Sequence, residues 1–201
     1  MTGPQAVVLV EGASDAAALE TLARRRGSSR TTVADGVVIV VLHGYTNLPA
    51  ALRALDPVVP QRIAVLCDEG AAGWVARTLG PRMLDPRVLG PGLLGAASGP
   101  PRDGTTPVTV RVCRSDLEDE MIRALGAGRV QELVDAEGEL ASLRSMRCQP
   151  AQRERSAEQQ LHRFLGTRAR RKERYGAVLA GALDLTALPE PLHRVLDDAG
   201  L

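Results

Sequence analysis

Four short apolar segments alternate with segments of helical periodicity along the first 125 residues, and this alternation constrains the fold more than any other feature. Continuous apolar runs are typical of strands that are buried on both faces of a parallel sheet. Helices that alternate with such strands act as right-handed crossovers between them. The sequence therefore predicts an α/β fold, with a parallel sheet flanked by helices. The strands are expected at Ala6–Val10, Val37–Leu42, Arg62–Cys67 and Val108–Cys113.

After Gly126 the strand signals end, and only helical patterns follow. We therefore predict an α/β core over residues 1–126 and a helical C-terminal region over residues 127–201 that packs on it. Between Asp85 and Pro107, a stretch rich in glycine and proline predicts a long loop. Ser14 or Asp15 is expected to cap the first helix, and Asn47 the second. The helices are expected at Ala16–Arg26, Asn47–Leu55, Ala71–Leu79, Asp116–Leu125, Arg129–Ala136, Ala157–Leu165, Ala169–Leu183 and Pro191–Ala199.

Acidic side chains follow three of the four expected strands. Glu11 directly follows the first strand and Asp68 the third, whereas Asp116 and then Glu118 come shortly after the fourth. Because parallel strands end at one edge of the sheet, these acids are expected to converge where ligands bind in open α/β folds. Carboxylates without a nearby His or Cys favour a hard divalent cation, Mg²⁺ or Mn²⁺. Helix capping is the alternative, and for Asp15 and Asp116 taken alone it is the favoured one.

The net charge of +1 hides two oppositely charged segments. Residues 116–139 include eight acidic and two basic residues, whereas residues 144–174 include ten basic and three acidic residues. An acidic zone beside a basic zone is what a metal site that faces a phosphate backbone requires. Solvated helix faces are the alternative explanation. Aromatic residues make up only 2% of the chain, which argues against base stacking as the main binding mode.

The cysteines and the N-terminus bear on the compartment. Cys67, Cys113 and Cys148 form no CxxC pair, and their odd number fits neither a disulfide framework nor a zinc site. No apolar run approaches the roughly 18 residues of a membrane helix. The first residues carry no basic segment of the kind that begins a signal peptide. The sequence therefore predicts a cytoplasmic protein with no membrane attachment.

Four segments, taken in order, resemble the motifs of a known family. Val10–Asp15 resembles the first motif of TOPRIM domains, in which a strand ends in Glu-Gly and an acid follows four residues after the Glu. Leu66–Gly70 occupies the place of the second, Asp-x-Asp, motif. Ser115–Glu120 resembles the acidic segment of TOPRIM domains of OLD (overcoming lysogenisation defect) family nucleases, and Arg163–Thr167 and Arg170–Tyr175 resemble their basic C-terminal segment. The chain thus looks like a free-standing OLD-type TOPRIM domain, with a Rossmann-like parallel sheet and a helical C-terminal extension.

This resemblance implies Mg²⁺- or Mn²⁺-dependent cleavage of nucleic-acid phosphodiesters, and it assigns roles to residues of this chain. Glu11 would act as a metal ligand or general base, and Lys172, the only lysine of the chain, would support the scissile phosphate. Gly12 would let backbone approach the site closely. The expected partners are DNA or RNA, a separate ATPase protein and a second copy of the chain. The expected metal ligands are Glu11, Asp15, Asp68, Asp116 and Glu118, and the expected nucleic-acid contacts are Arg168, Arg170, Arg171, Lys172 and Arg174.

The chain departs from the family in two respects. Gly70 stands where the second acid of Asp-x-Asp belongs, and adjacent Glu69 is not expected to replace it because neighbouring strand side chains point apart. No GxxxxGK[ST] loop occurs, so no ATP hydrolysis is expected. A second hypothesis is therefore a TOPRIM module with weakened chemistry that binds nucleic acid or regulates a partner such as a separate ATPase. A third, a doubly wound domain for a small phosphorylated ligand, lacks a glycine-rich phosphate loop after the first strand.

Overall fold

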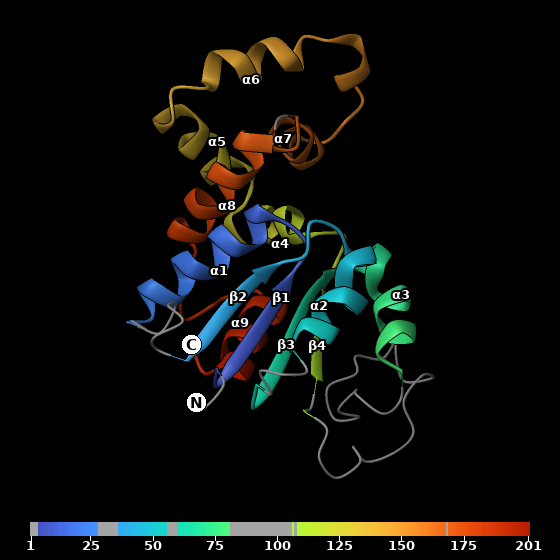
Figure 1. Cartoon of the computed structure of the whole chain (residues 1–201). Helices are drawn as coiled ribbons and strands as arrows, with labels where there is room; N and C mark the ends of the chain where they lie inside the picture. Colours follow the sequence, from blue (N-terminus) through green and yellow to red (C-terminus); the bar gives the residue numbers. More distant parts are fainter. Residues whose placement is uncertain (1–3, 28–35, 56–59, 81–105, 107, 168) are drawn as a thin grey trace.

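The computed structural model describes residues 4–27, 36–55, 60–80, 106, 108–167 and 169–201. Its centre is a parallel sheet in the order β2-β1-β3-β4 (Figure 1). The strands are β1 (Ala6–Val10), β2 (Val37–Val41), β3 (Arg62–Asp68) and β4 (Val108–Cys113). Strand β1 pairs in parallel with both β2 and β3. Val8 of β1, for example, lies opposite Ile39 of β2 and Ala64 of β3. The α/β fold with a parallel sheet, predicted from the alternation of apolar runs, is confirmed.

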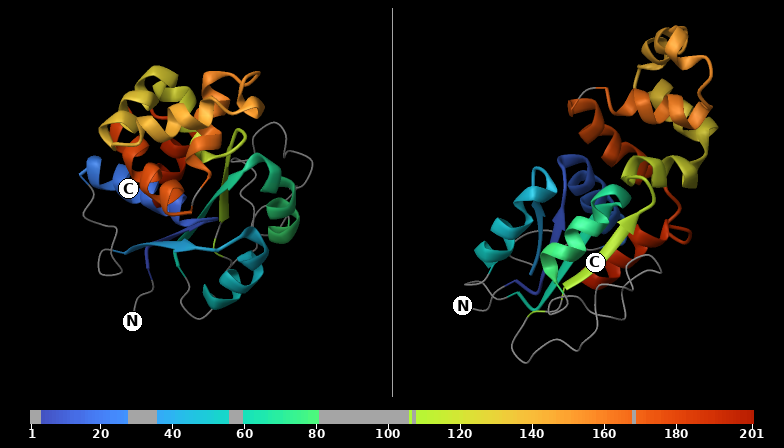
Figure 2. Two further views of the ribbon diagram at one scale, coloured as in Figure 1. Left: turned by 90° about the horizontal axis from the view of Figure 1, so that it is seen from above. Right: turned by 90° about the vertical axis from the view of Figure 1, so that its right-hand side faces the viewer.

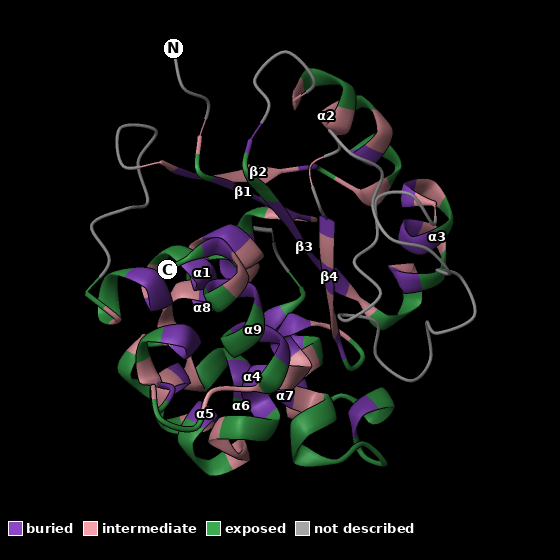
Figure 3. Cartoon of the chain, turned by 90° about the horizontal axis from the view of Figure 1, so that it is seen from below, coloured by how far each residue is buried: buried purple, intermediate pink, exposed green. Residues whose placement is uncertain are grey.

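Helices cover both faces of the sheet (Figure 2). Side chains of alternate strand residues enter two separate hydrophobic clusters, because successive residues of a strand point to opposite faces. Val8 and Val10 pack with α1 (Ala13–Arg25) and α9 (Glu190–Ala199). On the other face, odd-numbered residues of β1 pack with α2 (Leu48–Leu55) and α3 (Glu69–Leu79). Burial on both faces explains why β1 and most of β3 are buried along their length (Figure 3).

The helical C-terminal region stands above the carboxyl ends of the strands (Figure 1). It follows α4 (Leu117–Leu125). Its helix α8 (Ala169–Ala182) lies alongside α1, and its last helix, α9, packs against the sheet at β3 and β4. Because α8 and α9 share one hydrophobic cluster with α1 and β1, the end of the chain completes the core of the sheet. The boundary at residue 126 stays a prediction. The remaining helices are α5 (Ala127–Ala136), α6 (Leu140–Arg147) and α7 (Ala157–Leu165), with short 3₁₀ helices η2 (Tyr45–Asn47) and η4 (Pro150–Gln152).

The observed helices differ from the expected ones mainly at their starts. Helix α1 begins at Ala13 with Gly12 as its N-cap, so the prediction that Ser14 or Asp15 is the N-cap is wrong. Asn47 belongs to η2 rather than to the start of a helix, and helix α6 was not expected at all. Most of the expected loop between residues 85 and 107 lies outside the described residues. In the described part of the chain, every helix is too short or too polar to cross a membrane.

Candidate functional site

A cavity of about 430 Å³ opens at the carboxyl edge of the sheet, where β1, β2 and β3 end. The turn between β1 and α1 supplies one part of its wall, the residues after β2 and at the end of β3 supply another, and the start of α8 faces them. Glu11, His43 and Asp68 line one cavity because parallel strands bring the residues at and after their ends to one edge of the sheet. The charged or titratable side chains that line it are Glu11, Asp15, His43, Asp68, Arg170, Lys172 and Glu173.

Asp15 lies at the third position of α1 and turns back toward the start of the helix. Its Oδ2 accepts a hydrogen bond from the backbone N–H of Gly12 (2.9 Å), and its Oδ1 accepts one from the Ser14 hydroxyl (3.4 Å). Burial raises the pKa of Asp15 to about 6, and the negative charges of Glu118 and Glu11 act in the same direction. Asp15 thus stabilises the start of the helix. Its hydrogen bonds and nearby positive charge do not fully offset the cost of burying its negative charge.

Asp68 ends β3 and is held there by Tyr45. The backbone N–H of Asp68 donates to the Tyr45 hydroxyl (3.3 Å), which itself donates to the carbonyl oxygen of Leu66 (3.1 Å). Burial, together with the nearby carboxylates of Asp15 and Glu11, raises the pKa of Asp68 to about 7. Mutual repulsion among these acids indicates a site that favours a bound cation.

The next acid of the site, Glu118, is already paired. Its side chain is only 3% exposed, and its Oε2 lies 3.3 Å from the Nζ of Lys172 on α8. Its other oxygen, Oε1, is buried without a hydrogen-bond partner in the described structure. Burial lowers the pKa of Lys172, but the charges of Glu118, Asp15 and Asp116 outweigh that effect and raise it overall. Lys172 therefore stays a cation at the wall of the cavity.

Asp116 turns away from that cavity and has two partners. It is the N-cap of α4, where its Oδ1 accepts from the backbone N–H of Asp119 (2.9 Å). Its Oδ2 lies 2.6 Å from Nε2 of His162 on α7. The hydrogen bond to Asp116 raises the pKa of His162. Burial raises the pKa of Asp116, but the hydrogen bonds with His162 and with the backbone N–H of Asp119 outweigh burial and lower this pKa overall. Asp116 lines a second cavity of about 770 Å³, with Arg155 and His162 among its neighbours.

The second TOPRIM-like motif is arranged differently from the expectation. Helix α3 begins at Glu69, directly after Asp68, so Gly70 lies in the first helical turn and not on a continuing strand. Glu69 is engaged elsewhere: its Oε2 accepts from the backbone N–H of Ser115 (3.1 Å). It does not replace the missing acid, as expected, but the physical reason is this bond rather than strand alternation. Gly12 also differs, because its extended backbone would suit other residues and a Cβ there would meet nothing closer than 3.8 Å.

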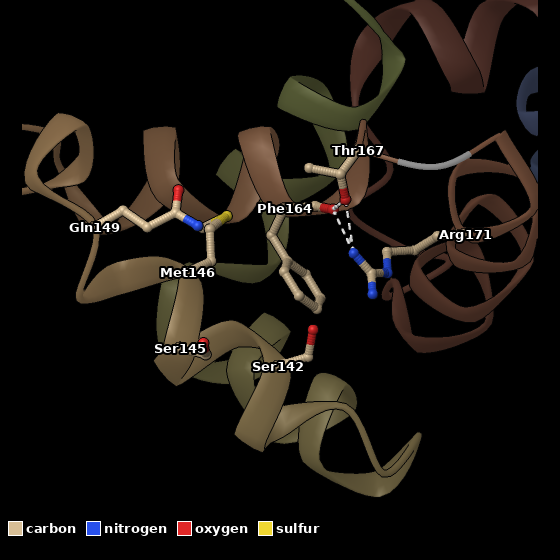
Figure 4. Close-up of a pocket in the computed structure, with 7 residues that line it drawn as sticks. All are labelled: Ser142, Ser145, Met146, Gln149, Phe164, Thr167 and Arg171. Atoms are coloured by element: carbon tan, nitrogen blue, oxygen red, sulfur yellow. Dashed lines mark hydrogen bonds between the residues drawn. The ribbon is translucent and has the colours of Figure 1, made fainter.

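The expected basic contacts divide into two groups. Arg170 and Lys172 line the first cavity. Arg171 points into the helical region, where its guanidinium donates to the Thr167 hydroxyl (2.6 Å) and to the Phe164 carbonyl oxygen (3.3 Å), as Figure 4 shows. It also pairs with Glu139 (2.6 Å) and lies over the Phe164 ring, so its expected role at a nucleic-acid surface does not agree with its placement.

Arg174, another expected contact, is not among the residues that line the first cavity. Arg174 pairs with Glu137 and Glu139, on the side of α8 away from the acids at the strand ends. Arg168 lies outside the described residues. Some of the segregated charge seen in the sequence is therefore neutralised inside the helical region, which leaves Arg170 and Lys172 as the basic residues of the cavity.

Two histidines near the site were not identified from the sequence. His43, in the left-handed backbone region at φ 54°, lies just after β2 and lines the first cavity. The rule that found Glu11 and Asp68 could have found it, because it too follows a parallel strand. His162 gives no such signal, since its partner Asp116 lies 46 positions away and only the packing of α7 on α4 brings them together.

The residues of the first cavity fit a hard divalent cation. Its acids, Glu11, Asp15, Asp68 and Glu173, offer only oxygen atoms, as Mg²⁺ and Mn²⁺ prefer. In the described part of the chain, no three His, Cys, Asp or Glu side chains are grouped tightly enough to hold a metal by themselves. Mg²⁺ is commonly held by one or two carboxylates, and water and phosphate oxygens complete its coordination shell.

These features define a parallel α/β domain with an acidic cavity at its strand ends and a helical region above them. The chain is similar to the C-terminal region of the OLD protein of Xanthomonas campestris pv. campestris, with a TM-score of 0.60 and 17% identity over 98% of this chain and 92% of that one. It is also similar to the C-terminal region of the Burkholderia pseudomallei OLD protein, with a TM-score of 0.58 and 17% identity over 96% of each chain. No protein-family model matches the sequence, and neither does any curated protein. The expected likeness of the fold to that of OLD proteins is confirmed.

The raised pKa values predict how stability depends on pH without a metal. Asp15 titrates near 3.8 when unfolded and at about 6 when folded, so folding favours its protonated form. That contribution is fully present below about pH 4 and is lost as the pH rises through 6. Asp15→Asn, measured by denaturant unfolding in EDTA, should raise the free energy of unfolding at pH 8 by about 1–3 kcal/mol, and by less at pH 4.5. Glu20→Gln, which removes an exposed carboxylate from the same helix, provides the control.

Proposed function

We propose that this chain is a metal-dependent phosphodiesterase that acts on DNA or RNA. One observation carries the proposal: Glu11, Asp15 and Asp68 line one side of a cavity, and the start of α8 brings Arg170 and Lys172, beside Glu173, to the same cavity. An acidic side that attracts a divalent cation and a basic side that attracts phosphate oxygens are the two requirements for cleaving a phosphodiester. The fold that the chain shares with the C-terminal regions of two OLD proteins supports the proposal, as does the order of its motifs.

The residues of the chain divide the chemistry between them. A bound Mg²⁺ or Mn²⁺ would supply an activated water and neutralise charge on the phosphate. Glu11, which directly follows β1, would accept the proton of the attacking water. Lys172 uses its ammonium to pair with Glu118, but an ammonium has three N–H donors, so it can also donate to a phosphate oxygen. Arg170 would hold a further phosphate oxygen and fix the strand in the cavity.

The first test concerns the metal. Millimolar Mn²⁺ or Mg²⁺ should raise the melting temperature by about 3–6 °C when it is tenfold above its dissociation constant, because it binds only the folded state. Glu11→Gln should abolish that gain and leave the melting temperature in EDTA unchanged, whereas Glu20→Gln should keep the gain. The same proteins, incubated with plasmid DNA and with structured RNA, should cleave only with metal and only with Glu11 intact. A melting temperature that does not change when Mn²⁺ is added would contradict the proposal.

The second test concerns the basic side. Arg170→Ala and Lys172→Ala should each weaken nucleic-acid binding, and each should flatten the dependence of log K on log salt by about 0.7–0.9. Arg144→Ala is the matched control, because this arginine is exposed on α6, away from the cavity. Fluorescence anisotropy from 50 to 300 mM salt measures both quantities. If the double variant Arg170→Ala/Lys172→Ala kept the native slope of log K against log salt, the phosphate contacts would lie at other residues.

The second candidate function is a binding or regulatory module that works with a separate ATPase. Gly70 favours it, because the position of the second motif acid carries no side chain. Such a module would bind nucleic acid as strongly in EDTA as in Mg²⁺ and would cleave it in neither. The cleavage assay with Glu11→Gln therefore separates the two functions.

A further inference from the structure

The acids at the carboxyl edge fall into two groups according to their partners. Glu118 is paired with Lys172 and Asp116 with His162, so these two carboxylates already have basic neighbours inside the fold. Glu11, Asp15 and Asp68 have no basic side chain within ion-pair distance among the described residues. Among the described residues, the carboxylates of the cavity without a basic partner are therefore those at the ends of β1 and β3 and that of Glu173 on α8, and none of them lies at the start of α4.

The chain that follows Asp68 offers no further free carboxylate. Gly70, in the first turn of α3, offers no side chain, and a Cβ built there would have no atom within 4 Å. Glu69, the nearest other acid of that turn, is bonded to the backbone of Ser115. A second metal ion near Glu118 would therefore lack a ligand that the family motif normally provides from the end of β3.

We infer that this chain binds one divalent cation, held by one or two of the carboxylates of Glu11, Asp15 and Asp68 together with water, and uses the ammonium of Lys172 as a fixed second positive charge. The inference rests on the proposed function and specifies how many ions that site holds. It also changes the expected role of Glu118, from metal ligand to counterion of Lys172.

Glu118 cannot pair with Lys172 and bind a second metal ion at the same time. A carboxylate that is 3% exposed needs a positive partner, because an unpaired buried charge is strongly destabilising. Lys172 fills that need at 3.3 Å. A divalent cation on the same carboxylate would lie against the ammonium, and like charges at such a distance repel strongly in a poorly solvated site. Glu118 can therefore serve Lys172 or a second metal, and the structure shows it with Lys172.

Counting bound Mn²⁺ tests the inference without measuring cleavage. Isothermal titration, together with electron paramagnetic resonance of free Mn²⁺, should give one ion per native chain. Asp68→Asn should weaken Mn²⁺ binding at least tenfold, whereas Glu118→Gln should change it by less than about threefold. Lys172→Met leaves Glu118 without its cation, so this variant should bind a second ion. The double variant Lys172→Met/Glu118→Gln should return to one.

The outcomes separate this inference from the proposed function. Two ions on the native chain, or a tenfold loss on Glu118→Gln, would overturn the single-ion arrangement and leave the metal-dependent function in place. No ion at all on the native chain would overturn both. Thermal unfolding in EDTA identifies any variant that fails to fold. If Lys172→Met is such a variant, the comparison of Asp68→Asn with Glu118→Gln decides the question.

Discussion

Gly176→Ala should destabilise the protein by about 2–4 kcal/mol, as overpacked substitutions at rigid contacts do. Gly176 lies in the middle of α8, where this helix passes the start of α1. A Cβ at this position would lie 3.1 Å from the Cα and the carbonyl carbon of Ser14 and closer still to the carbonyl oxygen. The obstacle is backbone and not a flexible side chain, so one of the two helices must move.

Gly181→Ala is the matched control on the same helix. Gly181 is exposed, and a Cβ there would meet no atom within 4 Å. Alanine should therefore stabilise the helix by up to about 1 kcal/mol, because glycine costs about that much in a helix interior. Urea unfolding of the two variants measures both effects. If Gly176→Ala were as stable as the native protein, α1 and α8 would not pack as closely as the structure shows.

The same substitution should also disturb the site. Lys172 lies one helical turn before Gly176, so a displaced α8 would carry the ammonium away from Glu118. Nucleic-acid affinity at low salt should fall in Gly176→Ala and stay unchanged in Gly181→Ala. Measuring it at a temperature where both variants are folded separates this local effect from unfolding. The close contact of α8 with Ser14 thus links the packing of the core to the chemistry of the cavity.

The parts of the fold that depend on local pattern were predictable from the sequence. The ranges of β1 and β4 agree with the expected ones, and β1 is an apolar run that is buried on both faces of the sheet, as its sequence predicted. Since all strands are parallel, the residues after them must meet at one edge. The grouping of Glu11 and Asp68 around one cavity follows from that topology alone.

The rest of the site depends on contacts between distant segments, which no local pattern encodes. The pairing of Asp116 with His162 requires the packing of α7 on α4, and that of Glu118 with Lys172 requires the packing of α8 on α4. Arg171 shows the same difficulty. Within the basic run of α8 it is indistinguishable from Arg170 by residue type, yet only Arg171 turns inward, to Glu139.

The position of Gly70 could not be derived from the sequence either. Strand alternation predicted that residue 70 would point the same way as Asp68, but β3 ends at Asp68 and α3 begins at the next residue. Gly70 does not adopt the left-handed backbone region that would require glycine. An aspartate at this position should therefore fold without strain. In the first turn of α3 it should even stabilise the helix, by about 0.3–1 kcal/mol through the helix dipole.

Gly70→Asp should consequently tighten Mn²⁺ and Mg²⁺ binding by about tenfold or more, because it adds a carboxylate two residues after Asp68. A tenfold gain in affinity corresponds to about 1.4 kcal/mol of binding free energy. The native chain should bind Mn²⁺ in preference to Mg²⁺, since an incomplete ligand set suits the ion that is less demanding of geometry. Any cleavage activity of the native chain should be weak, and the substitution should raise it. Titration calorimetry with each metal, beside a plasmid cleavage assay, measures these effects.

Two further variants at position 70 isolate the role of the carboxylate. Gly70→Ala adds only a Cβ, and Gly70→Asn adds a side chain of the same size as Asp without its charge. Both should fold as well as the native chain, since the space around residue 70 is open, and neither should tighten metal binding appreciably. If Gly70→Asp folded normally but bound metal no better than Gly70→Asn, the alignment of residues 68–70 with the Asp-x-Asp motif would be wrong. The ligands of the cavity would then have to be sought among Glu11, Asp15 and the neighbouring His43, which the same strand-end geometry brings to its wall.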